Sequence, residues 1–174
     1  VTQVLNPNPG VFQVGLPYNS FYEYVFDGIF NSQDEIDKSP AQPNSGNLKP
    51  GDIKIKDVNG DGQITPDDRV SFSPFPKYTY SFGLNAGYKG FTLSAFFQGV
   101  KGQKAQVSLW GWDPFGQGAP PLTRFLNAWT PENHSQTTPA VYVQGYPGVV
   151  GYQNTYSLLD ASYLRMKNIN LSYS

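Results

Sequence analysis

The chain has 174 residues, of which 14% are charged and 16% are aromatic, and its formal net charge at pH 7 is −1. Twelve tyrosines and twelve phenylalanines accompany eighteen glycines and fifteen prolines, a composition typical of an all-β protein with many turns. The lack of Lys/Arg runs gives no sign of a nucleic-acid partner, and the lack of cysteine excludes disulfides and thiolate sites but leaves the redox compartment open.

No run of about 18 apolar residues occurs, so the sequence predicts no transmembrane helix. Membrane β-strands remain possible, because they alternate polar and apolar residues and hydropathy averages this signal away. The chain begins at Val1 without Met or a signal peptide. We therefore expect it to be a piece of a longer protein.

The first predicted strand lies near residues 20–30, in SFYEYVFDGIF. Period-two alternation places Tyr22, Tyr24 and Phe26 on one face of this strand. The opposite face carries the acidic residues Glu23 and Asp27.

A long connection, near residues 31–77, follows this strand. It opens with NSQDEI, where Asn31 or Ser32 would cap a short helix and Glu35 would return its carboxylate to the helix start. Farther along this connection, DVNGDGQITPDD (57–68) has the spacing of a twelve-residue calcium loop, in which alternate positions supply oxygen ligands and a glycine permits the turn. The predicted ligands are Asp57, Asn59, Asp61, the Gln63 carbonyl and Asp68, with Thr65 at the ninth position.

Two properties qualify the calcium prediction. Asp68 stands where such loops prefer glutamate, and Asn, Asp and Gly also dominate ordinary turns, so a simple turn is the alternative. Neither flank carries a long amphipathic helix that metal binding would reorient, so we expect a structural brace rather than a switch. Ile64 would anchor this loop to neighbouring structure.

The clearest predicted element is a hairpin, with strands near residues 78–88 and 91–99. Two residues, Lys89 and Gly90, form the turn, where glycine supplies a positive φ. This register opposes Tyr88 to Phe91 and continues to Phe82 opposite Phe97, so the apolar side chains share one face. The other face carries Thr, Ser, Gly, Asn and Gln, interrupted by Phe96.

Two interpretations of this hairpin remain open. Eleven residues suffice for a tilted strand to cross a bilayer, since about 9–11 are needed, and the tyrosines near both ends resemble interfacial girdles. Half of a soluble β-sandwich is the alternative, although its outer face would usually carry charged residues.

The second long connection, near residues 100–160, contains PPLTRFLNAWTPEN. Its prolines predict a helix start, with Leu122, Phe125, Leu126 and Trp129 at helical spacing, and we interpret this stripe as packing. Aromatic residues of this connection would either stack on sugar rings or pack the loop, and packing is the favoured interpretation. These residues are Trp110, Trp112, Phe115 and Tyr142.

The last predicted strand, near residues 162–174, alternates Ile169, Leu171 and Tyr173 with polar residues. Arg165 and Lys167 share the apolar parity and would lie outside a membrane, at the end of the strand. The connections are very unequal, one of two residues and the others of several tens. This asymmetry is typical of outer-membrane barrels, whose short turns face the periplasm.

The chain closely resembles the C-terminal barrel portion of the SusC/RagA family of TonB-linked outer-membrane transporters. The resemblance covers nearly the whole chain, in order. It is carried by PGDIKIKDVNGDGQITPDDR, YTYSFGLNAGYKGFTLSAFFQGVKG, SFYEYVFDGIFNSQDEI, AWTPEN and SYLRMKNINLSYS.

The resemblance implies a segment of a large antiparallel transmembrane barrel of about 22 strands, whose long extracellular loops carry short helices. It further implies a SusD-like surface lipoprotein at the mouth, energy supplied by TonB, and import of glycans or peptides. The plug, the TonB box and the closing strand are expected outside this chain. Glu23 stands where the family often has Gly; facing a lumen, it would contact substrate.

Other functional classes receive less support from the sequence. A secreted calcium-braced adhesion module, with a dockerin-like loop, is the main alternative, but such modules have paired loops and helices. A glycoside hydrolase would need two close carboxylates, for which the candidates are only Glu23, Asp27, Asp113 and Glu132. The single histidine, His134, lies in a polar stretch where solvation is the ordinary state. We therefore expect no enzyme activity.

Overall fold

The structure, a computed structural model, describes residues 15–43, 47–107, 115, 120–142 and 154–174. The chain divides into two compact units. The first unit comprises Val1–Phe72 and Gln106–Leu159, and the second comprises Ser73–Ala105 and Asp160–Ser174. No helix in the described ranges is long and apolar enough to cross a membrane. As predicted, the fold is nearly all β.

The first unit consists of short strands around a small core. β1 (Phe21–Tyr24) pairs with β4 (Arg69–Phe72), and β2 (Phe26–Ile29) pairs with β3 (Ile53–Ile55), both antiparallel. Tyr24, Ile53, Ile55 and Ile64 form the core cluster, which confirms Ile64 as the anchor of its loop. Among the described residues this unit also contains the helix α1 (Gln33–Lys38) and the 3₁₀ helices Pro66–Asp68, Thr123–Asn127 and Thr155–Ser157.

The strand predicted near residues 20–30 is not continuous. It divides into β1 and β2, which pair with different strands, and a register shift separates Phe26 from Gly28, whose φ is +120°. Glu23 and Tyr24 are both buried, so the two faces of β1 are covered rather than one. The prediction of a strand like those of the hairpin was therefore wrong for this segment.

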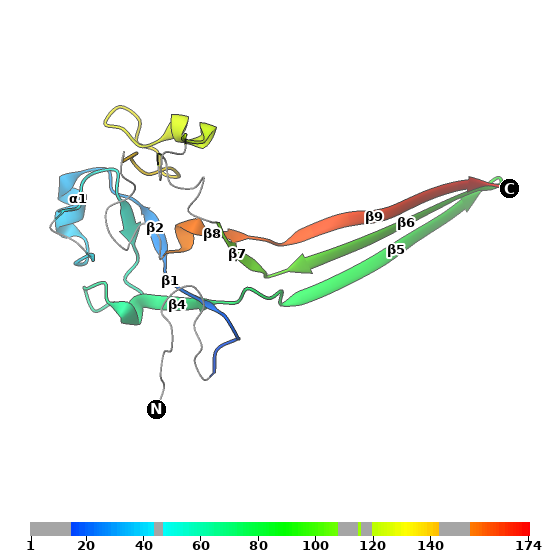
Figure 1. The fold of residues 1–174 in the computed structure, drawn as a ribbon, viewed down its shortest axis with the longest axis horizontal. Coiled ribbons are helices and arrows are strands. Elements are labelled where there is room, and N and C mark those ends of the chain that lie inside the picture. Colours follow the sequence, from blue (N-terminus) through cyan, green and yellow to red (C-terminus); the bar gives the residue numbers. More distant parts are fainter. Residues whose placement is uncertain (1–14, 44–46, 108–114, 116–119, 143–153) are drawn as a thin grey trace. The chain divides into compact units, whose positions relative to one another are not determined.

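The second unit is a three-stranded antiparallel sheet of eleven-residue strands (Figure 1). β5 (Tyr78–Tyr88) pairs with β6 (Phe91–Lys101), and β6 pairs with β9 (Tyr163–Tyr173). Lys89 and Gly90 both have positive φ, 46° and 85°, as a two-residue hairpin turn requires. The β5–β6 register matches the predicted one at every pair. The remaining strands, β7 (Lys104–Gln106) and β8 (Leu158–Asp160), pair with each other.

The helical segments differ from their predictions in detail. α1 has Ser32 as its N-cap, accepting from Glu35 N, but the Glu35 carboxylate accepts from Asn31 N rather than from Ser32. The predicted helix after Pro121 is a short 3₁₀ turn that buries Phe125 but leaves Leu126 90% exposed. Three residues per turn align positions i and i+3, so the i+4 residue leaves the packed face.

Candidate functional site

The three-stranded sheet exposes an apolar face. Cross-strand partners share a face, so the register alone determines which side chains lie together. On one face of this sheet, Leu84 is 59% and Leu171 is 66% exposed. The rings of Phe82 and Phe97 stack there, with their centroids 4.9 Å apart. We call the following set the apolar face: Tyr78, Tyr80, Phe82, Leu84, Ala86, Tyr88, Phe91, Leu93, Ala95, Phe97, Leu164, Met166, Ile169, Leu171 and Tyr173.

This face is too large for a surface that stays in water. Monomeric soluble proteins rarely expose contiguous apolar patches above a few hundred Å². Phe82 and Leu84 lie on an open sheet surface, not inside a core. The soluble-sandwich interpretation of the hairpin is therefore not supported.

The opposite, polar face carries mostly small uncharged side chains; its large members are Phe96, Arg165 and, at the loop end, Val100 and Tyr163. Its rows run across the sheet, for example Asn85 to Ser94 to Asn170. The set is Thr79, Ser81, Gly83, Asn85, Gly87, Thr92, Ser94, Phe96, Gln98, Val100, Tyr163, Arg165, Asn168, Asn170 and Ser172. Carboxylates are absent from this set, so the face is hydrophilic without being acidic.

A β-bulge in β9 changes the predicted placement of two cations. Phe96 pairs with Asn168 and Phe97 pairs with Met166, which leaves Lys167 unpaired. The extra residue reverses the parity of the preceding residues. Arg165 therefore lies opposite Gln98 on the polar face, not on the apolar parity that uninterrupted alternation predicted.

Glu23 is buried in β1, and its carboxyl group has few hydrogen-bond partners. Its side chain is 3% exposed, and Gln106 Nε2 donates to Oε1 at a long 3.4 Å. Oε2 has no hydrogen-bond partner among the described residues. Burial raises the pKa of Glu23 to about 7, against the lowering effects of the Arg69 charge and Gln106. As placed, Glu23 is not open to a substrate in solution.

The calcium-like loop is held by hydrogen bonds from its own main chain. Asp57 accepts from Gly60 N and Gly62 N. Asp68 accepts from the main-chain N–H groups of Val58, Asn59 and Thr65 at 2.8–3.2 Å. Burial raises the pKa of Asp68, but these three bonds, together with a side-chain interaction with Asp57, outweigh burial and lower the pKa overall.

The remaining predicted ligands make similar contacts. Asp61 accepts from Gln63 N and from the Asn59 side chain. Within the described residues, no group of three or more His, Cys, Asp or Glu side chains is arranged to hold a metal ion. Calcium therefore stays a prediction from the sequence.

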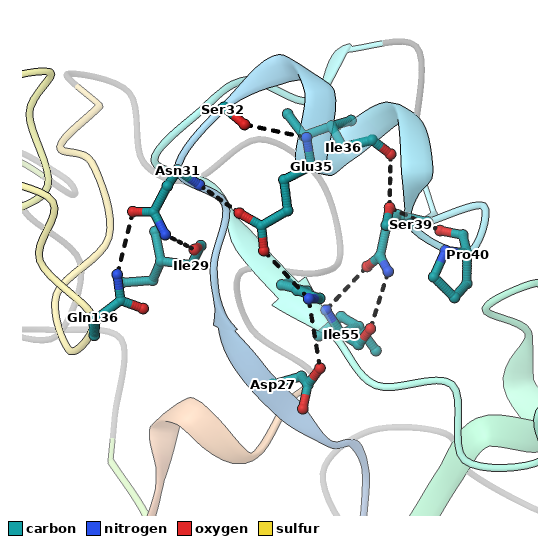
Figure 2. Close-up of polar contacts among 12 residues, drawn as sticks. Asp27, Ile29, Asn31, Ser32, Glu35, Ile36, Ser39, Pro40, Ile55 and Gln136 are labelled. Atoms are coloured by element: carbon teal, nitrogen blue, oxygen red, sulfur yellow. Dashed lines mark hydrogen bonds and ion pairs between the residues drawn. The ribbon is translucent and has the colours of Figure 1, made fainter.

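The two long connections meet at a junction centred on Asn31 (Figure 2). The Asn31 Oδ1 atom accepts from Trp129 Nε1 at 3.1 Å and from Gln136 Nε2 at 3.2 Å. The Asn31 main-chain N donates to Glu35 Oε2, and the other oxygen of Glu35 accepts from Lys54 Nζ at 3.3 Å. The start of α1 is thus tied to residues about one hundred positions away.

Gly51 and Asp52 complete this loop junction. Gly51 has φ +97°, and a Cβ there would lie 2.6 Å from both Trp129 Cε3 and Ala140 Cβ. Tyr142 donates its hydroxyl hydrogen to the buried Asp52 carboxylate. Burial raises the pKa of Tyr142, as do the hydrogen bond and charge of Asp52. This contact supports the loop-packing interpretation of Tyr142.

The other predicted aromatic contacts are less informative. Phe115 is exposed with a positive φ of 61°, while Trp110 and Trp112 lie outside the described residues, as does Asp113. The sequence did not single out Asn31, Gly51 or Asp52 for the junction. Only Pro50-Gly51-Asp52, a turn-like triplet, carries any signal, because the partners of these residues are distant in sequence.

No family model matches the chain. It is 29% identical over 167 residues to TonB-dependent receptor P3 of Formosa agariphila, and 32% identical over 166 residues to TonB-dependent receptor P26 of the same organism. These alignments cover 94% and 92% of the chain.

The fold also matches solved structures of an importer. Two structures, described as the RagAB peptide importer in the open-open state and the RagAB peptide transporter, superpose with TM-scores of 0.60 and 0.61 at 25% identity, over 99% of this chain.

The chain belongs to the TonB-dependent receptor family. It spans 16% of the length of the curated receptors that it matches and 17–18% of the RagAB chains. The proteins that this TonB-dependent receptor segment matches are named as receptors and importers rather than as enzymes.

Proposed function

We propose that the chain supplies part of the barrel wall and of the extracellular loops of an outer-membrane nutrient importer. The observation that carries this proposal is the sheet β5–β6–β9, whose apolar face suits lipid and whose polar face suits a hydrated lumen. The strands have the length that a tilted crossing requires. The family relationship supports the same function.

The proposal extends to energy source, partner and cargo. TonB would energise import through a part of the receptor outside this chain, and a SusD-like surface lipoprotein would cover the mouth. The matched RagAB structures are described as those of a peptide importer, which supports an oligopeptide as the first cargo to test and an oligosaccharide as the second. Trp110, Trp112 and Phe115 are proposed cargo contacts.

A secreted calcium-braced module accounts poorly for the same observations. Such a module would have to keep the apolar face in water, at a cost that grows with exposed apolar area. The importer is therefore the better explanation of the sheet.

Spin labels on adjacent positions of β5 test the wall in the full-length receptor, in membranes. The chain has no cysteine, so Leu84→Cys and Asn85→Cys each add one labelling site to this segment. We expect the Leu84 label to respond to oxygen, which dissolves in lipid, and the Asn85 label to respond to a water-soluble nickel chelate. Preference of the Leu84 label for the chelate would refute a lipid-facing surface.

Uptake by cells tests the import step separately. A strain lacking the receptor gene should lose accumulation of labelled oligopeptides, and the wild-type gene should restore it. A protonophore should abolish the restored uptake, because TonB draws on the proton gradient. Unchanged peptide and oligosaccharide uptake in the deleted strain would contradict the proposed function while leaving the wall geometry intact.

A further inference from the structure

Charge is divided unequally between the two units. The second unit contains six Lys and Arg residues and one acidic residue, a net charge of +5, whereas the first contains six cations and twelve acids, a net charge of −6. The overall charge of −1 conceals this division. A net positive charge on this sheet unit favours an anionic partner.

Three of the lysines gather at the loop end of the sheet. Lys77 immediately precedes β5, Lys101 ends β6, and their main chains are joined by a 2.9 Å hydrogen bond. Lys104 begins β7, three residues after Lys101. We call Lys77, Lys101 and Lys104 the lysine cluster.

Gly102 allows the side chain of Lys77 to approach the turn that follows β6. Its φ is +79°, and a Cβ at this position would lie 2.9 Å from Lys77 Cγ. The aliphatic stem of Lys77 therefore lies directly on the Gly102 main chain. The main-chain N–H of Gly102 donates to Ser162 Oγ at 3.0 Å, which links the turn to the start of β9.

The lysine cluster is not neutralised within the sheet unit. None of its members makes an ion pair within 4.0 Å among the described residues; the three ion pairs found there join Lys38 and Lys54 to acids of the first unit. Asp160 is the single acid of the sheet unit, and its carboxylate is engaged by Ser162. Two of the three lysine charges thus remain uncompensated.

The cluster also lies at a defined level of the apolar face. Lys101 pairs directly with Tyr78, so its side chain shares the apolar face with Tyr78 and Tyr80. Aromatic residues at the end of a membrane strand mark the headgroup level, where lysine stems follow apolar surface and their ammonium groups reach phosphate. The turn end carries Lys89 alone, over the Tyr88 ring.

We propose that Lys77, Lys101 and Lys104 bind the phosphate groups of anionic lipids in the membrane leaflet nearest the long loops. The inference rests on the proposed function, since it requires that the apolar face meets lipid. It adds a binding site and a ligand class, with Gly102 as the residue that lets the Lys77 stem lie against the turn between Lys101 and Lys104. Electrostatic attraction of this kind weakens with salt.

Lipid retention by the full-length receptor tests this site. The receptor is reconstituted in equal amounts of phosphatidylglycerol and phosphatidylcholine, extracted gently, and analysed for bound lipid by native mass spectrometry. We expect phosphatidylglycerol to be retained preferentially. The triple variant Lys77→Gln/Lys101→Gln/Lys104→Gln should lower the ratio about 25-fold, because each of the two uncompensated lysine charges contributes about fivefold near an anionic surface. High salt should lower the wild-type ratio.

Two further variants serve as controls: one removes the same charge at other positions, and one should raise the lipid ratio instead of lowering it. Lys38→Gln/Lys49→Gln/Lys56→Gln removes the same charge from exposed positions of the first unit and should leave the ratio within about twofold. Asp160→Asn removes the competing carboxylate and should raise the ratio. An equal fall in both triple variants, or no change in any, would overturn the proposal.

Two further outcomes are distinguishable. If the cluster variant fails to insert, Lys104→Gln alone and Asp160→Asn decide, and the absence of opposite shifts overturns the proposal. If the Leu84 spin label shows no contact with lipid, the wall itself is refuted. A lipid-facing Leu84 label with an unchanged lipid ratio refutes only the phosphate site.

Discussion

Burying the Glu23 carboxyl group in β1 favours its neutral form, because water is excluded and Oε2 lacks a hydrogen-bond donor among the described residues. A neighbouring cation, Arg69, offsets part of this effect but does not reverse it. The position thus holds a group whose charge changes near neutral pH. No such behaviour is visible in the sequence, where Glu23 is simply the polar member of an alternating strand.

Glu23 should make the stability of its unit depend on pH. Its pKa of about 7 in the folded state exceeds the ordinary 4.5, so the stabilisation is complete below pH 4.5 and is lost as pH rises through 7. Glu23→Gln should remove this dependence, worth at most about 3 kcal/mol, and stabilise the receptor at pH 8. Thermal unfolding of the receptor in detergent at pH 5 and pH 8 measures the effect.

The exposed Glu132 supplies the control for this measurement. Glu132→Gln should leave the difference between pH 5 and pH 8 unchanged. If Glu23→Gln retained the full pH dependence, another group would be responsible.

Among the elements, the hairpin β5–β6 was predictable in full and β9 only in part. Alternation and a two-residue turn fix the hairpin register, because a slip of one residue would move every side chain to the other face. The bulge at Lys167 leaves no mark in a single sequence, since its partner strand lies about seventy residues away. The same limit hid the contacts of Asn31 and Asp52.

The loop 57–68 illustrates an element whose position was predictable but whose bonding was not. Asp68→Asn should weaken it, because an amide has one acceptor oxygen where the carboxylate serves three N–H donors. The cost should be about 1–3 kcal/mol, seen as faster hydrogen exchange of residues 57–68 in the receptor. Asp67→Asn, at an exposed position, should have little effect.

Calcium addition and removal test the ion prediction on the same loop. If the sequence prediction is right, calcium slows exchange of residues 57–68 and EDTA reverses the change, with no effect in Asp68→Asn. Equal exchange with calcium and with EDTA would show that the main-chain hydrogen bonds brace the loop unaided.

For the molecule as a whole, the sequence identified the all-β class and the family, but not the division into two units. The split of charge between them follows from the topology, which joins Ser73–Ala105 to Asp160–Ser174 across the intervening chain. Composition averaged over 174 residues cannot reveal it. The roles of the site residues were less predictable from the sequence, because they depend on contacts with residues that only the fold brings close.

The chain expressed alone should not remain monomeric in water. β5 and β9 are the edges of the sheet, and open edges beside an apolar face promote association. Light scattering after gel filtration should show aggregates without detergent and smaller, uniform particles with it. A monodisperse monomer without detergent would argue against a membrane wall.

The bulge in β9 also governs where this strand can change length. Because Lys167 is the unpaired residue, losing its codon would leave Met166 and Asn168 on the sides they already occupy. Deleting Ile169 instead would move the side chains on one side of the deletion to the opposite face of the sheet. Deletions at position 167 should therefore be tolerated during evolution, and gaps in alignments of related receptors should be most frequent there.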